Sequence, residues 1–167
     1  MGEARKSNIE KISEAGLLRV QSLAQRIWPE CFAGILPPDH IDAIVEEVYN
    51  LKTLSADIAE RHHIYWIAQV DGEDAGYASA YREGERVWIK KLYLLDTCRG
   101  LGLGKRLIAT ALAAFPGAAS VGLYVNDGNV SAIDFYRAQG FTIEALVPVR
   151  MGPFDLHDYV MARPVAN

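Results

Sequence analysis

Apolar residues in the first third of the chain recur at three- and four-residue steps, which is the pattern of amphipathic helices. The first stripe predicts a helix that begins at Leu17 and ends at Trp28-Pro29, after a short strand at residues 9–12. A second helix should begin near Pro38, and a third should occupy residues 54–61. The apolar stripes that should face the core are Leu17, Val20, Leu23, Ala24 and Ile27 in the first helix and Ile41, Ile44, Val45 and Val48 in the second.

The pattern changes at residue 64 to segments rich in β-branched and aromatic residues. Strands are predicted at residues 64–70, 75–81 and 87–95, with a hairpin turn at Asp71-Gly72 and another turn at residues 82–85. This part of the chain should therefore form an antiparallel meander.

Helices and strands alternate in the remainder of the chain. A helix starting at Leu103 should stop at Pro116-Gly117, and a second should run over residues 129–139, with Gly140 as a left-handed cap. A strand at residues 121–125 separates the two helices, and strands at residues 141–147 and 157–162, joined by a Gly-Pro loop, close the chain. We predict an α/β fold in one domain over residues 1–167, with a mixed sheet covered by helices on both faces.

Composition is that of an ordinary globular domain, because 50% of the residues are hydrophobic and 23% are charged. The net charge of −4 gives no overall positive field, so we expect neither nucleic acid nor a membrane as a partner. Cys31 and Cys98 have no metal-ligand spacing and form no disulfide framework, so we expect no metal and a reducing cytoplasm. The sequence contains no signal-peptide core and no run of membrane-spanning length.

Residues 94–107, LLDTCRGLGLGKRL, combine dense glycine with flanking cations between a predicted strand and a helix. The P-loop pattern fails because a glycine is missing where Arg99 stands, and the dinucleotide fingerprint fails because the glycines fall at every second position. A helix N-terminus still offers unpaired N–H groups to an anion, and Arg99 and Lys105 add charge. A diphosphate fits this arrangement. A turn that merely joins strand to helix is the alternative.

A second group of residues lies one strand and one helix further along, at residues 126–141. Asn129 is a natural helix cap, and the helical repeat places it on the same face as Ala132, Ile133 and Tyr136. Because a strand–helix–strand crossover makes its two strands parallel, the glycine loop and this helix start should lie at one edge of the sheet.

These motifs resemble the GNAT superfamily of N-acetyltransferases. RGLGLG at residues 99–104 is similar to its Q/R-x-x-G-x-G/A acetyl-CoA signature, and NVSAIDFYRAQGF at residues 129–141 is similar to its N-x-x-A-x-x-[FL]-Y-x-x-x-G-F helix. The strand IKKLYLLD before the loop and the closing strand DYVMARP also resemble the family, so the likeness covers residues 87–164. The resemblance implies the GNAT acyl-CoA N-acyltransferase fold, with a mixed, mostly antiparallel sheet.

The resemblance also implies which residues bind acetyl-CoA. Tyr93, Leu94 and Leu95 would pair with the pantetheine arm, an amide near Leu94 or Leu95 would polarise the thioester carbonyl, and Asn129 would contact the pantetheine region. Arg99 would assist a cradle for the diphosphate. The backbone amides of that cradle would be those of Gly100, Leu101, Gly102, Leu103, Gly104 and Lys105.

Tyr136 matches the family's general acid, which protonates the leaving thiolate. A phenol suits that task because its ordinary pKa, near 10, keeps the proton available at neutral pH. A core tyrosine with a solvated hydroxyl is the alternative. The family often carries a glutamate as base on the long strand, but Trp88 or Ile89 stands in that region here. Glu85, Asp96, His62 and His63 are weak candidates, and we assign no base.

We therefore expect an enzyme that transfers acetyl from acetyl-CoA to a primary amine of a small molecule, such as a polyamine, an amino acid derivative or an amino-bearing antibiotic. A protein N-terminal or lysine acetyltransferase and a non-catalytic coenzyme A-binding module are the alternatives. Phe154 is a candidate lid residue, and the oligomeric state, including a homodimer, stays open. Aromatic residues that either line an acceptor pocket or pack in the core are Trp28, Phe32, Tyr49, Tyr65 and Trp66.

Overall fold

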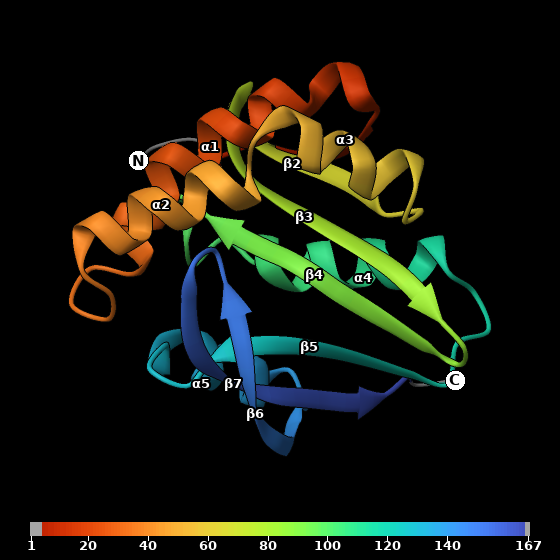
Figure 1. Cartoon of the computed structure of the whole chain (residues 1–167). Helices are drawn as coiled ribbons and strands as arrows, with labels where there is room; N and C mark the ends of the chain where they lie inside the picture. The colour runs from red at the N-terminus through yellow and green to blue at the C-terminus, as the bar shows by residue number, and fades with distance from the viewer. Residues whose placement is uncertain (1–4, 166–167) are drawn as a thin grey trace.

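The computed structural model describes residues 5–165, and its centre is one seven-stranded sheet in the order β1-β2-β3-β4-β5-β7-β6 (Figure 1). All neighbouring strands pair antiparallel except β4 and β5, which are parallel. The predicted fold class, a mixed and mostly antiparallel sheet, is therefore confirmed. The strands are β1 Ser7–Ile12, β2 Ile64–Val70, β3 Glu73–Glu83, β4 Arg86–Leu94, β5 Ser120–Asn126, β6 Thr142–Met151 and β7 Phe154–Pro164.

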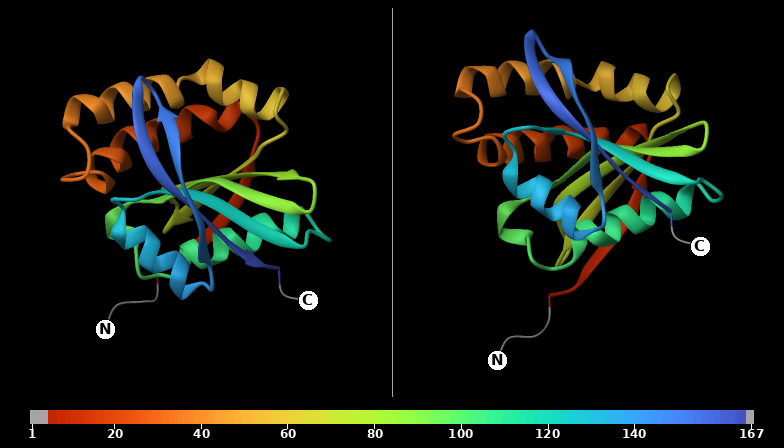
Figure 2. Two further views of the ribbon diagram at one scale, coloured as in Figure 1. Left: turned by 60° about the horizontal axis from the view of Figure 1, so that its bottom comes forward. Right: turned by 90° about the horizontal axis from the view of Figure 1, so that it is seen from below.

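Helices cover both faces of this sheet. The three N-terminal helices lie over one face, and the two later helices lie over the other (Figure 2). Two short 3-10 turns, Glu14–Gly16 and Asp96–Cys98, precede α1 and the glycine loop. No helix within residues 5–165 is both long and apolar enough to cross a membrane. The α-helices are α1 Leu17–Cys31, α2 Pro38–Val48, α3 Leu51–Ala59, α4 Leu103–Ala114 and α5 Val130–Ala138.

Several predicted boundaries differ from the structure for local reasons. Helix α1 continues past Pro29 to Cys31, because a proline in the last turn removes only one helical hydrogen bond. Helix α3 begins three residues early, since the Asn50 side chain accepts a hydrogen bond from the Thr53 N–H and caps it.

The two closing strands are longer than predicted. They pair from Thr142 to the tight turn at Gly152 and Pro153, so Phe154 starts β7 and is not part of a long loop. Pro148 is tolerated in β6 because this strand lies at the edge of the sheet. The hairpin turn predicted at Asp71-Gly72 is confirmed, since both residues have positive φ angles.

The feature that creates the site is the short pairing between β4 and β5. Their register covers only Arg86–Ile89 against Ser120–Leu123, although both strands continue. The β3–β4 register shifts after Ile89, which leaves Lys90 as an extra residue in β4. Beyond this bulge the two strands diverge and leave an opening in the middle of the sheet.

Aromatic residues fill the layer between α1–α3 and the sheet. The Trp28 Nε1 lies 3.1 Å from the Tyr49 hydroxyl and 3.2 Å from that of Tyr77, and the two hydroxyls are 2.7 Å apart. Tyr65 and Trp66 are also buried. All five aromatic residues considered for an acceptor pocket therefore belong to the core, and Phe32 also lines a cavity described below.

Candidate active site

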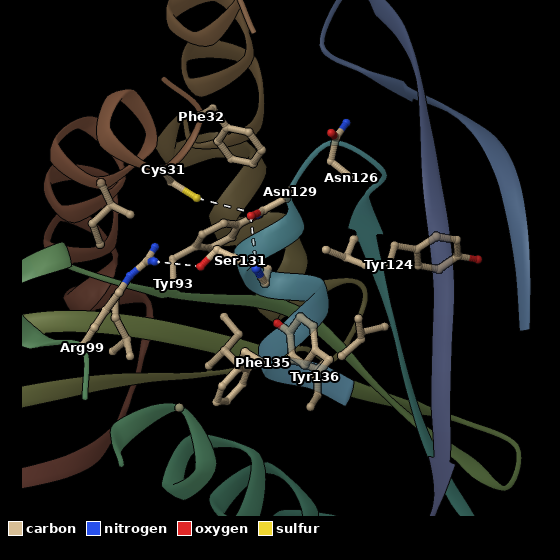
Figure 3. Close-up of a pocket in the computed structure, with 18 of the residues that line it drawn as sticks. Cys31, Phe32, Tyr93, Arg99, Tyr124, Asn126, Asn129, Ser131, Phe135 and Tyr136 are labelled. Atoms are coloured by element: carbon tan, nitrogen blue, oxygen red, sulfur yellow. Dashed lines mark hydrogen bonds between the residues drawn. The ribbon is translucent and has the colours of Figure 1, made fainter. Parts of the chain in front are cut away.

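A cavity of about 400 Å³ occupies the opening between β4 and β5 (Figure 3). Its walls come from both diverging strands, the glycine loop, the inner face of α5, the end of α1 with the loop after it, and the β6–β7 hairpin. Residues from the two predicted motifs therefore meet at one place. Among the predicted site residues, Leu95 and Leu101 do not line this cavity, and the others do.

Three glycines of the loop have two different structural roles. Gly100 and Gly102 have φ angles of +80° and +76°, which side-chain-bearing residues rarely adopt, and a Cβ on either would project into open space. Gly104 lies in α4, where a Cβ would come within 2.8 Å of the Phe135 Cζ. The first two glycines shape the loop, whereas the third lets α4 approach α5.

The loop presents a continuous run of backbone donors. Within the described residues, the N–H groups from Gly100 to Lys105 have no hydrogen-bond acceptor, and the first pairing after them is Arg106 N to Gly102 O at 3.1 Å. These amides include the first turn of α4, where the helix dipole is positive. The arrangement is suited to an anion with several oxygens.

Arg99 spans the gap between the loop and α5. Its Nη1 donates to the Ser131 Oγ at 3.2 Å, and its Nε lies 3.7 Å from an Asp96 carboxylate oxygen (Figure 3). The guanidinium is therefore held beside the free amides, and the Lys105 side chain adds a second positive charge to the same wall.

The end of β4 offers backbone groups to the opening. Leu95 N donates to Ala75 O at 2.8 Å, so this amide points toward β3 and is occupied. Successive N–H groups of a strand point to opposite sides, so the Leu94 N–H points toward the diverging β5. Of the two predicted oxyanion donors, Leu94 is the one whose amide is directed into the opening. Tyr93 lines the cavity and packs against Trp28.

Asn129 lies at the start of α5, as its spacing predicted. Its side chain accepts a hydrogen bond from the Ala132 N–H at 3.3 Å, and its Nδ2 lies 3.9 Å from the Cys31 Sγ (Figure 3). Asn129 therefore caps the helix and also lines the cavity. Cys98, by contrast, is buried in the core, which agrees with a packing role.

Tyr136 lies two helical turns further along the face of α5 that lines the cavity (Figure 3). Its ring packs edge-on against Phe135 and Phe141, and its hydroxyl has no hydrogen-bond partner within the described residues. Burial raises the pKa of Tyr136 above its ordinary value, with a smaller contribution from Cys31. The phenol therefore keeps its proton throughout the physiological pH range.

None of the weak base candidates lies in this cavity. Glu85 and His62 are exposed, and Asp96 borders a smaller neighbouring pocket. His63 is buried against Tyr81, and burial lowers its pKa to about 4. No group of three or more potential metal-ligating side chains is found between residues 5 and 165.

Sequence reasoning missed a carboxylate in the cavity wall. Asp158 of β7 is 4% exposed and lines the cavity, and burial, with a contribution from Asp127, raises its pKa to about 6. The available signal was a lone acidic residue in the otherwise apolar closing strand DYVMA. Asp158 belongs to neither of the two motifs, which end at residue 141.

Comparison with known proteins places this geometry in a family. The sequence model described as the acetyltransferase (GNAT) family matches residues 20–141. The chain belongs to the GNAT family of acetyltransferases. The family and enzyme class predicted from the sequence, an acetyl-CoA-dependent acyltransferase, are thus confirmed.

Relatives and solved structures agree with this assignment. An uncharacterized N-acetyltransferase of Mycobacterium bovis is 32% identical over 145 residues, which cover 85% of this chain and 93% of the relative. A probable N-acetyltransferase of Mycobacterium tuberculosis is 28% identical over 137 residues, which cover 75% of this chain and 74% of the relative. The PaiA N-acetyltransferase of Thermoplasma acidophilum, solved in complex with coenzyme A, has the same fold, with a TM-score of 0.80, 22% identity and coverage of 96% and 99%.

Proposed function

We propose that this GNAT acetyltransferase transfers acetyl from acetyl-CoA directly to a primary amine of a small molecule, with Tyr136 as the general acid. The observation that carries the proposal is the run of unpaired amides from Gly100 to Lys105, which belongs to the same cavity wall as Tyr136. One cavity therefore contains both the backbone donors that a diphosphate needs and the protonated phenol of Tyr136.

The amides of Gly100, Leu101, Gly102, Leu103, Gly104 and Lys105 fit the diphosphate of coenzyme A, since each provides an unused N–H. Arg99 adds a charge-assisted donor next to them. Gly100 and Gly102 carry no side chain and have positive φ angles, so phosphate oxygens can approach the backbone at these two residues. The coenzyme A complex of the structurally similar PaiA protein is consistent with this site.

The pantetheine arm contains amide groups that can pair with an open strand. Tyr93 and Leu94 form the end of β4 that β5 leaves unpaired, so an extended arm in the opening would take the place of a neighbouring strand. Leu95 follows the strand, and its N–H is already bonded to Ala75. The Leu94 N–H is then the donor for the thioester oxygen. Asn129, at the opposite side of the opening, would contact the same arm.

Tyr136 supplies the proton that the departing sulfur needs. Its raised pKa keeps the phenol protonated at neutral pH, so the proton is present when negative charge develops on the departing sulfur. The absence of an acceptor for its hydroxyl within the described residues leaves this proton free for transfer.

The β6–β7 hairpin favours a small acceptor. Its tip lies next to α2 (Figure 2). There the Phe154 and His40 rings stack with centroids 3.8 Å apart, and a Cβ on Gly152 would lie 3.2 Å from Ile44. The acceptor side of the cavity is thereby covered, which supports a small amine over an extended peptide.

The test is thiol release from acetyl-CoA in the presence of a panel of small amines and short peptides. We expect turnover with at least one small amine, and a large loss of kcat with Tyr136→Phe while coenzyme A affinity is unchanged. If every amine is inert although coenzyme A binds tightly, the protein is a coenzyme A-binding module and the proposal is wrong. Turnover confined to peptides would instead identify a protein acetyltransferase.

A further inference from the structure

Asp158 of β7 lines the cavity between β4 and β5. Alternate residues of a strand share a face, so Asp158 projects from β7 to the same side as Leu156 and Phe154. Phe154 stacks on His40 of α2, which identifies this as the face covered by α1–α3. Helix α5, which carries Tyr136, lies over the opposite face of the sheet (Figure 2). A reactant beside Asp158 and a proton donor at Tyr136 thus flank one opening.

The carboxylate has no partner of its own. Within residues 5–165 no side chain or backbone group donates a hydrogen bond to it, and its Oδ1 is fully enclosed. It is also the one acidic side chain among the described residues that line this cavity. A buried carboxylate without a donor is costly, because desolvation is not compensated. This cost is expected where a ligand provides the missing donor.

Resting on the proposed function, we infer that Asp158 is the residue that binds the ammonium group of the acceptor and removes its proton. A single carboxylate can neutralise one ammonium group. The same cavity is lined by the apolar side chains of Phe32, Leu36, Met151 and Leu156, and by the uncharged Asn126 that pairs with Asp158 in the sheet. The chemistry therefore selects a primary monoamine with an apolar body over a polyamine, whose further cations would be desolvated without counter-charges.

Charged groups around Asp158 tune its basicity. Burial raises its pKa most, Asp127 in the loop after β5 raises it further, and Lys90 of β4 lowers it, with a result of about 6. At neutral pH the group is ionised but is a stronger base than an ordinary aspartate. The other titratable side chains in the cavity are Cys31 of α1, Tyr93 of β4, Tyr124 of β5, Tyr136 of α5, and Arg99 and Lys105 of the loop.

The proton balance closes with these two residues. The bound ammonium gives one proton to Asp158, and the neutral nitrogen forms the C–N bond with the acetyl carbon. As the C–S bond breaks, the sulfur takes the phenol proton of Tyr136. The second proton lost by the nitrogen restores Tyr136, and Asp158 releases its proton to solvent. The products are the N-acetyl amine, coenzyme A thiol and one proton.

The experiment compares the wild type with Asp158→Asn, and with Asp127→Asn as the matched control outside the cavity. Initial rates of thiol release are measured with an aryl-alkyl monoamine, an alkyl monoamine and spermidine between pH 5 and pH 9, and coenzyme A binding is measured by calorimetry. We expect Asp158→Asn to lower kcat/KM for the monoamines by at least about 100-fold. Its coenzyme A affinity should be unchanged, and Asp127→Asn should remain active.

The pH profile separates catalysis from structure. Wild-type kcat/KM should rise with an apparent pKa near 6, and this limb should disappear in Asp158→Asn. If the wild type acetylates amines and Asp158→Asn keeps its rate and its pH profile, this inference is wrong and the proposed function stands. A preference for spermidine would overturn the assignment of a monoamine. If no amine reacts with the wild type, the proposed function and this inference fail together.

Discussion

Replacing Asp158 by Asn should remove the pH dependence that this buried carboxylate gives to the stability of the protein. The folded-state pKa is about 6, against an ordinary value of 3.8. Between these values the folded protein binds more protons than the unfolded chain, so the free energy of unfolding falls as the pH rises. The difference in pKa corresponds to about 3 kcal/mol at pH 7, and about half of that at pH 5.

The variant removes this dependence. Its amide is also buried without a partner, which costs about 1–3 kcal/mol, but that cost is the same at every pH. The free energy of unfolding of Asp158→Asn relative to wild type should therefore increase by about 1.3 kcal/mol between pH 5 and pH 7. Urea unfolding followed by the fluorescence of the buried Trp28 and Trp66 measures it.

Asp127→Asn is the control, because Asp127 is exposed in the loop next to this site. The difference in free energy of unfolding between Asp127→Asn and the wild type should change much less between pH 5 and pH 7. A pH-independent difference for Asp158→Asn, or one that decreases toward pH 7, would refute the reasoning that burial makes this carboxylate hard to ionise in the folded state.

Three further predictions concern the acid, the loop and the core. Tyr136→Phe should lower kcat about 100-fold or more with coenzyme A affinity intact, and an unchanged rate across pH would contradict its role as acid. Gly102→Val should weaken coenzyme A binding at least about tenfold by calorimetry, whereas Gly117→Val, at a similar φ of +84° outside the cavity, should not, although both strain the backbone. Asp57→Asn should lower the free energy of unfolding by about 3–5 kcal/mol in urea denaturation, because the buried Lys91, 3.4 Å from Asp57, loses its counter-charge. A loss under about 1 kcal/mol would show that water already solvates Lys91.

The sequence predicted the order of the elements well, because the apolar spacing and the turn residues are local signals. Leu103 as the start of α4 and Gly140 as a left-handed cap are examples. Ends of elements were less accurate where a side chain decides them, as Asn50 does for α3. The alternating glycines were recognised as a loop, but the contact between Gly104 and Phe135 depends on the packing of two helices and could not be seen.

The acceptor side of the site illustrates the limit of sequence reasoning. Tyr136 and the loop amides belong to motifs whose residues are close in sequence, so their meeting could be predicted. Asp158 reaches the cavity through pairing of β7 with β5, in register with Asn126. That register depends on a long connection and an antiparallel closing strand, for which no local pattern specifies which residues face inward.

The opening between β4 and β5 has a further consequence for how acceptor preference can change. The loop that contains Arg99 and the N-terminus of α4 belongs to one part of the chain, whereas Phe32, Leu36 and the β6–β7 hairpin belong to others. Because the two sets approach the opening from different sides, substitutions in one set need not disturb the other. Evolution can therefore alter the amine that is used by varying the α1–α2 connection and the hairpin, while the part of the chain proposed to hold the donor is inherited unchanged.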